Sequence, residues 1–314
     1  MPALIAAYAA TAALVATLWP LLTYSTSLAL FGLGHVFFEL RYIDARFGAR
    51  LPARFWVQCA IPLALIVGLR LLRLVDVIDS DVSVGGEMAL VALLVAMAVP
   101  LAWSHARVVG VVGVVVAAVL SVATLRAPLQ VLLTLAVLHN ATPLGFVVER
   151  APAGRKLRTL LLGALLFFGV PALVASGWPS LWLAELVDLD KTWLPSTGVL
   201  ADHFAVYLWP SWRDETCAAQ LFSAAVTAQL LHYAAVLFWL PRSLASDEAP
   251  TLPWPRPAVF VVVVGALTFG LWVHFTIDFM AARALYGLVA AVHAWIELPL
   301  FVVAFAVVPR LRSP

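Results

Sequence analysis

Charged side chains are scarce in this chain. Lys, Arg, Asp and Glu make up 11% of its 314 residues, whereas a soluble domain has about 25%. Hydrophobic residues reach 64%, above the about 45–50% of soluble domains. The composition excludes a soluble globular domain. Apolar runs of about twenty residues recur, each long enough to cross about 30 Å of hydrocarbon as a helix. We therefore predict an all-α, polytopic integral membrane helical bundle.

Lysine and cysteine are also rare. The two lysines, Lys156 and Lys191, lie in expected loops, so no span offers an amine for retinal and a rhodopsin is excluded. Cys59 and Cys217 fall near the ends of helices on opposite membrane faces, so we expect no disulfide between them. There is no Cys or Ser nucleophile motif and no phosphate-binding glycine loop. The start of the chain lacks a basic region, so we interpret it as a retained helix.

The apolar runs predict about nine or ten transmembrane helices within a single domain, residues 1–314. The count is nine if Trp19-Pro20 is only a kink, and ten if it separates two helices. Charged residues, Pro or Gly mark the other breaks. The expected spans are 3–18, 21–41, 54–75, 88–104, 108–125, 128–148, 158–176, 216–240, 257–277 and 284–308.

Basic residues of the short loops predict the orientation, because Lys and Arg favour the cytoplasmic side. With these spans, four basic clusters share one face: Arg41, Arg46, Arg50 and Arg54; Arg150, Arg155, Lys156 and Arg158; Arg242 and Arg256; Arg310 and Arg312. The opposite loops are acidic or poor in basic residues, as after the third span: Asp76, Asp79, Asp81 and Glu87. We expect a multi-pass protein, with a cytoplasmic C-terminus, in a bacterial inner membrane. The net charge of +2 is spread over loops, so we expect no nucleic-acid partner.

One long outer segment, about residues 177–215, is rich in tryptophan, which favours the membrane–water interface. Its tryptophans are Trp178, Trp182, Trp193, Trp209 and Trp212. Within it, "SLWLAELVDL" predicts an amphipathic helix that lies on the membrane surface. The segment is interpreted as a structured cap or, alternatively, as a lid or lateral gate.

Four of the seven histidines fall inside expected spans that run in the same direction. At 1.5 Å rise per residue, they lie roughly 21, 17, 24 and 14 Å below the outer boundary, within a slab about 10 Å thick. They are His35, His139, His232 and His293. Neutral imidazole binds iron, copper, zinc and nickel. The shared depth therefore predicts a transition-metal site with these histidines as ligands, although packing and proton-relay roles remain open.

Two carboxylates accompany the histidines. Glu39 follows His35 by four residues, and Glu297 follows His293 by four, so each pair shares one helix face. A carboxylate at mid-membrane is costly and normally faces a partner inside the protein. Glu297 and Glu39 are our candidate catalytic residues, although Glu39 alternatively pairs with Arg41 or Arg46. Two polar neighbours, Asn140 and Tyr233, are candidate cofactor-binding residues that fix an imidazole tautomer.

Four short motifs resemble one known family. "GLGHVFFE" resembles the first motif of the Brp/Blh-type β-carotene 15,15′-dioxygenases, in which an acidic residue follows a histidine by four. "AVLHNATPL", "LLHYAAVLF" and "AVHAWIELPLF" resemble its later histidine motifs, in the same order. Val236 stands where the third motif has a second histidine. The resemblance implies a non-haem iron, held by histidines in a helical bundle, that cleaves a carotenoid with dioxygen.

Several functions remain open at this point. The first is a membrane-embedded, metal-dependent oxygenase or oxidoreductase that acts on a lipophilic, possibly carotenoid-like, substrate. Its cofactor would be Fe(II), with copper, zinc or haem as alternatives. We therefore expect an enzyme. The alternatives are a haem-binding electron carrier, a transporter or proton-coupled channel and a zinc-dependent membrane hydrolase.

Overall fold

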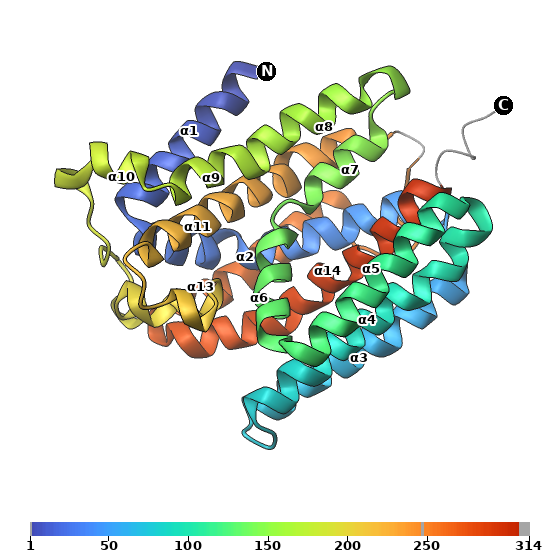
Figure 1. Cartoon of the computed structure of the whole chain (residues 1–314), viewed down its shortest axis with the longest axis horizontal. Coiled ribbons are helices and arrows are strands. Elements are labelled where there is room, and N and C mark those ends of the chain that lie inside the picture. The colour runs from blue at the N-terminus through green and yellow to red at the C-terminus, as the bar shows by residue number, and fades with distance from the viewer. Residues whose placement is uncertain (1, 246–247, 308–314) are drawn as a thin grey trace. The chain divides into compact units, whose positions relative to one another are not determined.

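The chain is an all-α polytopic helical bundle, as the composition predicts (Figure 1). The computed structural model describes residues 2–245 and 248–307, which contain no β-strand. Eight of their helices are long and apolar enough to cross a membrane, and a bent pair makes a ninth. The length and composition of these helices therefore define a multi-pass membrane protein.

The bounds of the helices follow the hydropathy pattern closely. The unbroken ones are α1 (Pro2–Leu18), α2 (Pro20–Phe47), α3 (Ala53–Leu74), α4 (Ser80–His105), α5 (Arg107–Arg126), α13 (Pro257–Ile277) and α14 (Phe279–Val307). The bent pair is α6 (Pro128–His139) and α7 (Thr142–Arg150). Two long helices contain a π-helical turn: α8 (Lys156–Ala164), η2 (Leu165–Gly169) and α9 (Val170–Ala175); α11 (Ala218–Ala234), η7 (Ala235–Trp239) and α12 (Leu240–Ser243).

Two of the predicted boundaries need comment. Trp19 separates α1 from α2, so Trp19-Pro20 ends one helix and begins another. The prediction that Glu87 lies in a loop is wrong, because α4 begins at Ser80. The side chain of Asp79 accepts a hydrogen bond from the backbone N–H of Val82 at 2.8 Å and caps the helix there.

The chain divides into two compact units. The first contains Met1–Glu39, Ala136–Ser243 and Pro255–Tyr286, and the second contains Leu40–Leu135, Leu244–Trp254 and Gly287–Pro314. In the first unit, α1, α9 and α11 pack against one another. In the second, α3, α4 and α5 lie side by side as successive antiparallel helices (Figure 1).

Close packing of small residues joins helices within the first unit. A Cβ atom at Gly163 of α8 would lie 2.1 Å from Cδ1 of Leu144 on α7, so a larger residue there would force the Leu144 side chain to move. Leu144 also belongs to a buried cluster with Phe167 and Leu231. Lipid chains are as apolar as these side chains, so tight packing, and not the hydrophobic effect, stabilises helix contacts in a membrane.

A buried ion pair lies inside the second unit. Arg70 of α3 donates to both carboxylate oxygens of Glu87, at 2.8 and 2.6 Å. Arg70 also donates to the Gly287 carbonyl at 2.6 Å, and Trp295 donates to Glu87 at 2.7 Å. The pair therefore ties α3 and α4 to α14. It explains why an arginine and a glutamate are present in two strongly apolar helices.

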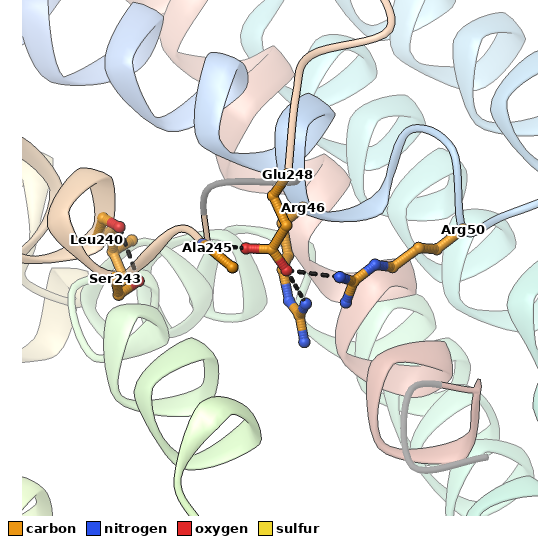
Figure 2. Close-up of polar contacts among 6 residues, drawn as sticks. All are labelled: Arg46, Arg50, Leu240, Ser243, Ala245 and Glu248. Carbon is orange, nitrogen blue, oxygen red and sulfur yellow. Dashed lines mark hydrogen bonds and ion pairs between the residues drawn. The ribbon is translucent and has the colours of Figure 1, made fainter. Parts of the chain in front are cut away.

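Figure 2 shows a second ion-pair cluster of this unit, at the end of α2. Arg46 and Arg50 both donate to Oε1 of Glu248, and Nη2 of Arg50 lies 2.5 Å from that oxygen. The backbone N–H of Ala245 donates to Oε2 at 2.9 Å. Arg46 and Glu248 are almost completely buried. Two of the arginines that predict the cytoplasmic face therefore also anchor the loop after α12.

Asp44 holds the other end of the same loop. It accepts hydrogen bonds from the Thr251 hydroxyl, the Leu252 backbone N–H and the Trp254 indole N–H. These three hydrogen bonds fasten the loop to α2. The predicted basic residues Arg310 and Arg312 lie outside the described residues.

The outer segment is less helical than the sequence predicts. Its "SLWLAELVDL" stretch forms only the end of α10 (Trp178–Trp182) and the 3-10 turn η3 (Ala184–Leu186), so the prediction of one amphipathic helix is wrong. Gly177 has a left-handed φ of 74° where the chain leaves α9, and α10 ends after five residues. Trp178 and Trp182 are nevertheless exposed, as residues at a membrane interface would be.

Hydrogen bonds fasten this segment to helices of the first unit. The Trp193 indole N–H donates to the Thr26 hydroxyl at 2.6 Å, and the Ser196 hydroxyl donates to the Phe275 carbonyl at 2.8 Å. The Asp188 backbone N–H donates to the Leu18 carbonyl at 2.8 Å. Contacts to α1, α2 and α13 favour a structured cap over a mobile lid.

His203 is the buried centre of the cap. It lies in the 3-10 turn η5 (Leu200–Val206), and its Nε2–H donates to the Thr197 carbonyl at 2.8 Å. The other ring nitrogen therefore accepts from Arg283, 3.0 Å away. Burial, with a smaller contribution from the Arg283 charge, lowers the pKa of His203, although the Thr197 carbonyl and Asp202 act in the opposite direction. The cap thus needs a neutral imidazole.

We expect the cap to loosen in mild acid. Because the folded pKa of His203 is below its ordinary value of 6.5, the unfolded cap binds the proton more readily. The stabilisation is complete above pH 6.5 and is lost as pH falls below that value. The protection of backbone amides between residues 194 and 213 against hydrogen exchange, after correction for the intrinsic pH dependence, should fall on acidification. In a His203→Gln variant this pH-dependent loss of protection should be absent; the same loss in that variant would show that another group is responsible.

Candidate metal centre

Three of the four predicted histidines come together in the first unit. His35 is on α2, His139 is the last residue of α6, and His232 is near the end of α11. One ring nitrogen from each lies within 4.8 Å of those of the other two. The ring centroid of His232 is 5.2 Å from that of His35 and 4.6 Å from that of His139. Residues about a hundred positions apart in sequence thus form one cluster of imidazoles.

The separations are compatible with shared coordination of a cation. A typical metal–nitrogen distance is about 2.1 Å, so two nitrogens on one ion are at most about 4.2 Å apart. Three nitrogens around one ion are about 3.6 Å apart, so nitrogens within 4.8 Å of one another need inward shifts of at most about 0.7 Å each. His35 and His232 are buried, and His139 is partly exposed, so the cluster is largely shielded from solvent.

The tautomer of His35 suits a ligand. Its Nδ1 is 3.2 Å from the carbonyl of Phe31, one turn earlier on α2. A carbonyl oxygen only accepts, so Nδ1 carries the hydrogen and Nε2 keeps its lone pair. Histidines that bind metals commonly donate their second ring N–H in this way, which fixes the ring orientation.

Glu39 belongs to the same cluster. Its Oε2 is 3.4 Å from Nε2 of His232, and both side chains are almost completely buried. Glu39 therefore lies beside a histidine, and Arg46 binds Glu248; both interpretations of Glu39, as a site residue and as a partner of Arg41 or Arg46, stay predictions. A carboxylate at this position can orient the imidazole, accept its proton or add a hard oxygen ligand.

The break between α6 and α7 positions His139. The two helices are bent by 46° at the intervening residues, and Pro143 follows at the start of α7. The Asn140 amide donates to the Ala136 and Val137 carbonyls, and the Thr142 hydroxyl donates to the His139 carbonyl. These bonds satisfy carbonyls that the broken helix exposes. Asn140 therefore shapes the break that presents His139.

Tyr233, the other predicted cofactor-binding residue, packs on His35. Their ring centroids are 4.2 Å apart at an interplanar angle of 32°. Tyr233 also lies two residues before the π-helical turn η7, which begins at Ala235. π-helical turns are rare and frequently occur at functional sites. The sequence gives no signal for this turn.

A chain of hydrogen-bonded polar side chains joins Tyr207 of the cap to α11 and α2. The Tyr207 hydroxyl donates to the Gln229 side-chain carbonyl, and the Gln229 amide donates to the Ser27 hydroxyl at 3.1 Å. Burial raises the pKa of Tyr207 well above its ordinary value, so its hydroxyl stays protonated. Gln229 precedes His232 by three residues, and this spacing puts both on one face of α11.

The remaining two candidates, His293 and Glu297, belong to the second unit. Both lie on α14 and are buried. Trp295, between them in sequence, donates to Glu87 of the buried ion pair. Arg70 and Glu87, which the sequence did not identify as a pair, thus fix the helix segment that carries both candidates.

The fold and this cluster define a class: a multi-pass helical membrane protein with histidines and a carboxylate gathered inside the bundle. Comparison of the chain with known protein families, with curated proteins and with solved structures gave no match. Its function therefore has to be argued from the geometry of the site.

Proposed function

We propose that this protein is a membrane-embedded, metal-dependent oxidoreductase that acts on a lipophilic substrate. One observation carries the proposal: ring nitrogens of His35, His139 and His232 lie within 4.8 Å of one another inside membrane-spanning helices. Several imidazole nitrogens gathered at one point inside the protein form the kind of ligand set that transition metals bind. A cation is the simplest partner for several lone pairs.

The ligand set is proposed to be His35, His139, His232 and His293. The sequence puts His293 at the same depth as the other three. Glu297, one turn beyond it, and Glu39 are proposed as carboxylates that ligate or hold a proton. Imidazoles together with carboxylates favour iron, and we propose Fe(II); copper and zinc share part of this ligand chemistry.

A redox-active ion would supply Lewis acidity and electron transfer at an open coordination position. The residues of this chain would supply the rest. The helix break keeps His139 in place, and Glu39 takes or returns a proton beside His232. The buried surroundings exclude water. Carotenoid cleavage, which the four motifs imply, is one possible reaction of this class.

The geometry supports this function over two of the three alternatives, the haem carrier and the transporter. A haem carrier needs room for a macrocycle between two axial histidines, and a third imidazole nitrogen within 4.8 Å would obstruct it. A transporter would show paired broken helices, whereas one bent pair occurs in the described spans. A zinc hydrolase uses similar ligands, so metal identity separates it from an oxidoreductase.

The arginine clusters support an orientation with the cap outside. Arg46 and Arg50, at the end of α2, and the other basic loops would then face the cytoplasm. We propose a bacterial inner membrane, with the C-terminus in the cytoplasm.

The experiment that tests the function is elemental analysis of the purified protein combined with an optical spectrum. We expect about one or two equivalents of transition metal per chain, as the ligand number allows, and no Soret band. A wild-type protein without metal above background would contradict the proposal. A Soret band would indicate haem, and zinc alone would indicate a hydrolase.

A further inference from the structure

A cavity of about 230 Å³ lies in the first unit, between α6, the η2–α9 stretch, α11 and the cap. Its wall is formed mainly by alanine and aromatic side chains, including Phe167, Phe168, Ala172, Tyr207, Ala224 and Ala228. None of the lining residues carries a charge. It is therefore suited to hydrocarbon and not to an ionic ligand.

The cavity leads toward the histidine cluster. Ala224, Ala228 and His232 are spaced by four residues on α11, so they occupy one helix face in succession. The first two line the cavity. Val137 and Leu138 of α6 and Ala141 of the break after it also line the cavity, and they flank His139 on both sides in sequence. Two of the proposed ligands thus lie next to its wall.

The other end of the cavity meets the surface that faces lipid. Ala172 lines the cavity and is exposed, and so are Phe168 and Leu138. The π-helical turn η2 carries Phe167 and Phe168, and the extra residue of a π turn displaces side chains from the regular helical positions. An opening among exposed apolar residues admits molecules from the bilayer.

We propose that this cavity admits an uncharged, slender hydrocarbon chain from the membrane and leads it to the histidine cluster. This names the substrate class and rests on the proposed function for its catalytic meaning, whereas binding of the chain needs no metal. The small alanine side chains on α11 leave space for a chain, and we expect a cavity of about 230 Å³ to be too small for a fused-ring lipid. The Tyr207 hydroxyl, whose hydrogen is donated to Gln229, can still accept one hydrogen bond from a hydroxyl on the chain.

The test is photolabelling of the protein in nanodiscs with hexadecanol that carries a mid-chain diazirine. We expect labelled peptides from α9 and the alanine face of α11, with competition by unlabelled hexadecanol and none by cholesterol. Ala172→Trp should reduce this labelling about tenfold, because it removes several methylene contacts. If the tryptophan variant does not fold, Ala172→Leu replaces it in the experiment and should reduce the labelling by a smaller factor.

Leu173→Trp is the matched control, since Leu173 is adjacent and exposed but does not line the cavity. The Leu173→Trp variant should be photolabelled to the same extent as the wild type. Equal labelling of the Ala172 and Leu173 variants, or labelling spread evenly over exposed helices, would overturn the inference. Metal content is measured on the same samples. If labelling is not selective although metal is retained, the inference that the cavity binds a hydrocarbon chain is contradicted and the proposed function is not. If metal-free wild type is labelled selectively, only the proposed function is contradicted.

Discussion

Replacing His139 or His232 with alanine is expected to remove nearly all bound metal. Each variant loses one of a few ligands, and even loss of a residue that only orients a ligand lowers metal affinity by about 10–100-fold. Content should fall to below about a tenth of the wild-type value. The measurement is elemental analysis of purified, metal-reconstituted protein, with thermal unfolding recorded alongside. His293→Ala should behave in the same way if the depth of His293 in its helix is decisive.

His274→Ala is the matched control for this series. His274 ends α13 in the first unit, outside the cluster, so its variant should keep full metal content. His203→Ala should also keep metal, although the cap would lose the bond to Arg283. Equal retention of metal in the His139, His232 and His274 variants would refute the assignment of ligands.

Replacing Glu87 with alanine is expected to destabilise the protein severely. Glu87 accepts two hydrogen bonds from Arg70 and one from Trp295. Its removal leaves the guanidinium without its carboxylate inside a helix bundle, which costs about 3–5 kcal/mol when a buried pair is broken. The expected result is a large fall in the unfolding temperature of the detergent-solubilised protein.

Asp76→Ala provides the comparison, because Asp76 pairs with Arg73 at 2.7 Å on the surface of the same unit. Both of these side chains are substantially exposed, and such a pair contributes about 0–1 kcal/mol. The two variants remove the same kind of contact at different depths. Similar unfolding temperatures would mean that the Arg70–Glu87 pair is well solvated and does not fix α14.

Local sequence signals explain which fold predictions were accurate. Hydropathy located α3, α5 and α13 to within a residue or so, because lipid requires about twenty apolar residues with internally satisfied backbone groups. It placed the start of α4 too late, since Asp79 and the following polar residues look like a loop but cap a helix. The five-residue length of α10 was also missed.

The site divides in a similar way. Periodicity associated Glu39 with His35, since four residues complete about one helical turn. No local pattern indicates which histidine of another helix Glu39 lies beside, or that Arg70 binds Glu87. Those contacts join residues 193 and 17 positions apart, and they depend on how the helices rotate and pack.

By itself, the sequence determined that this is an all-α polytopic helical bundle and predicted a common depth for its histidines, because both follow from the length and rise of single apolar helices. Only the tertiary structure decided that His35, His139 and His232 come together and that an apolar cavity lies between α6, α9 and α11. The depth of a side chain follows from its position along one helix, whereas its proximity to side chains of other helices depends on how several helices pack.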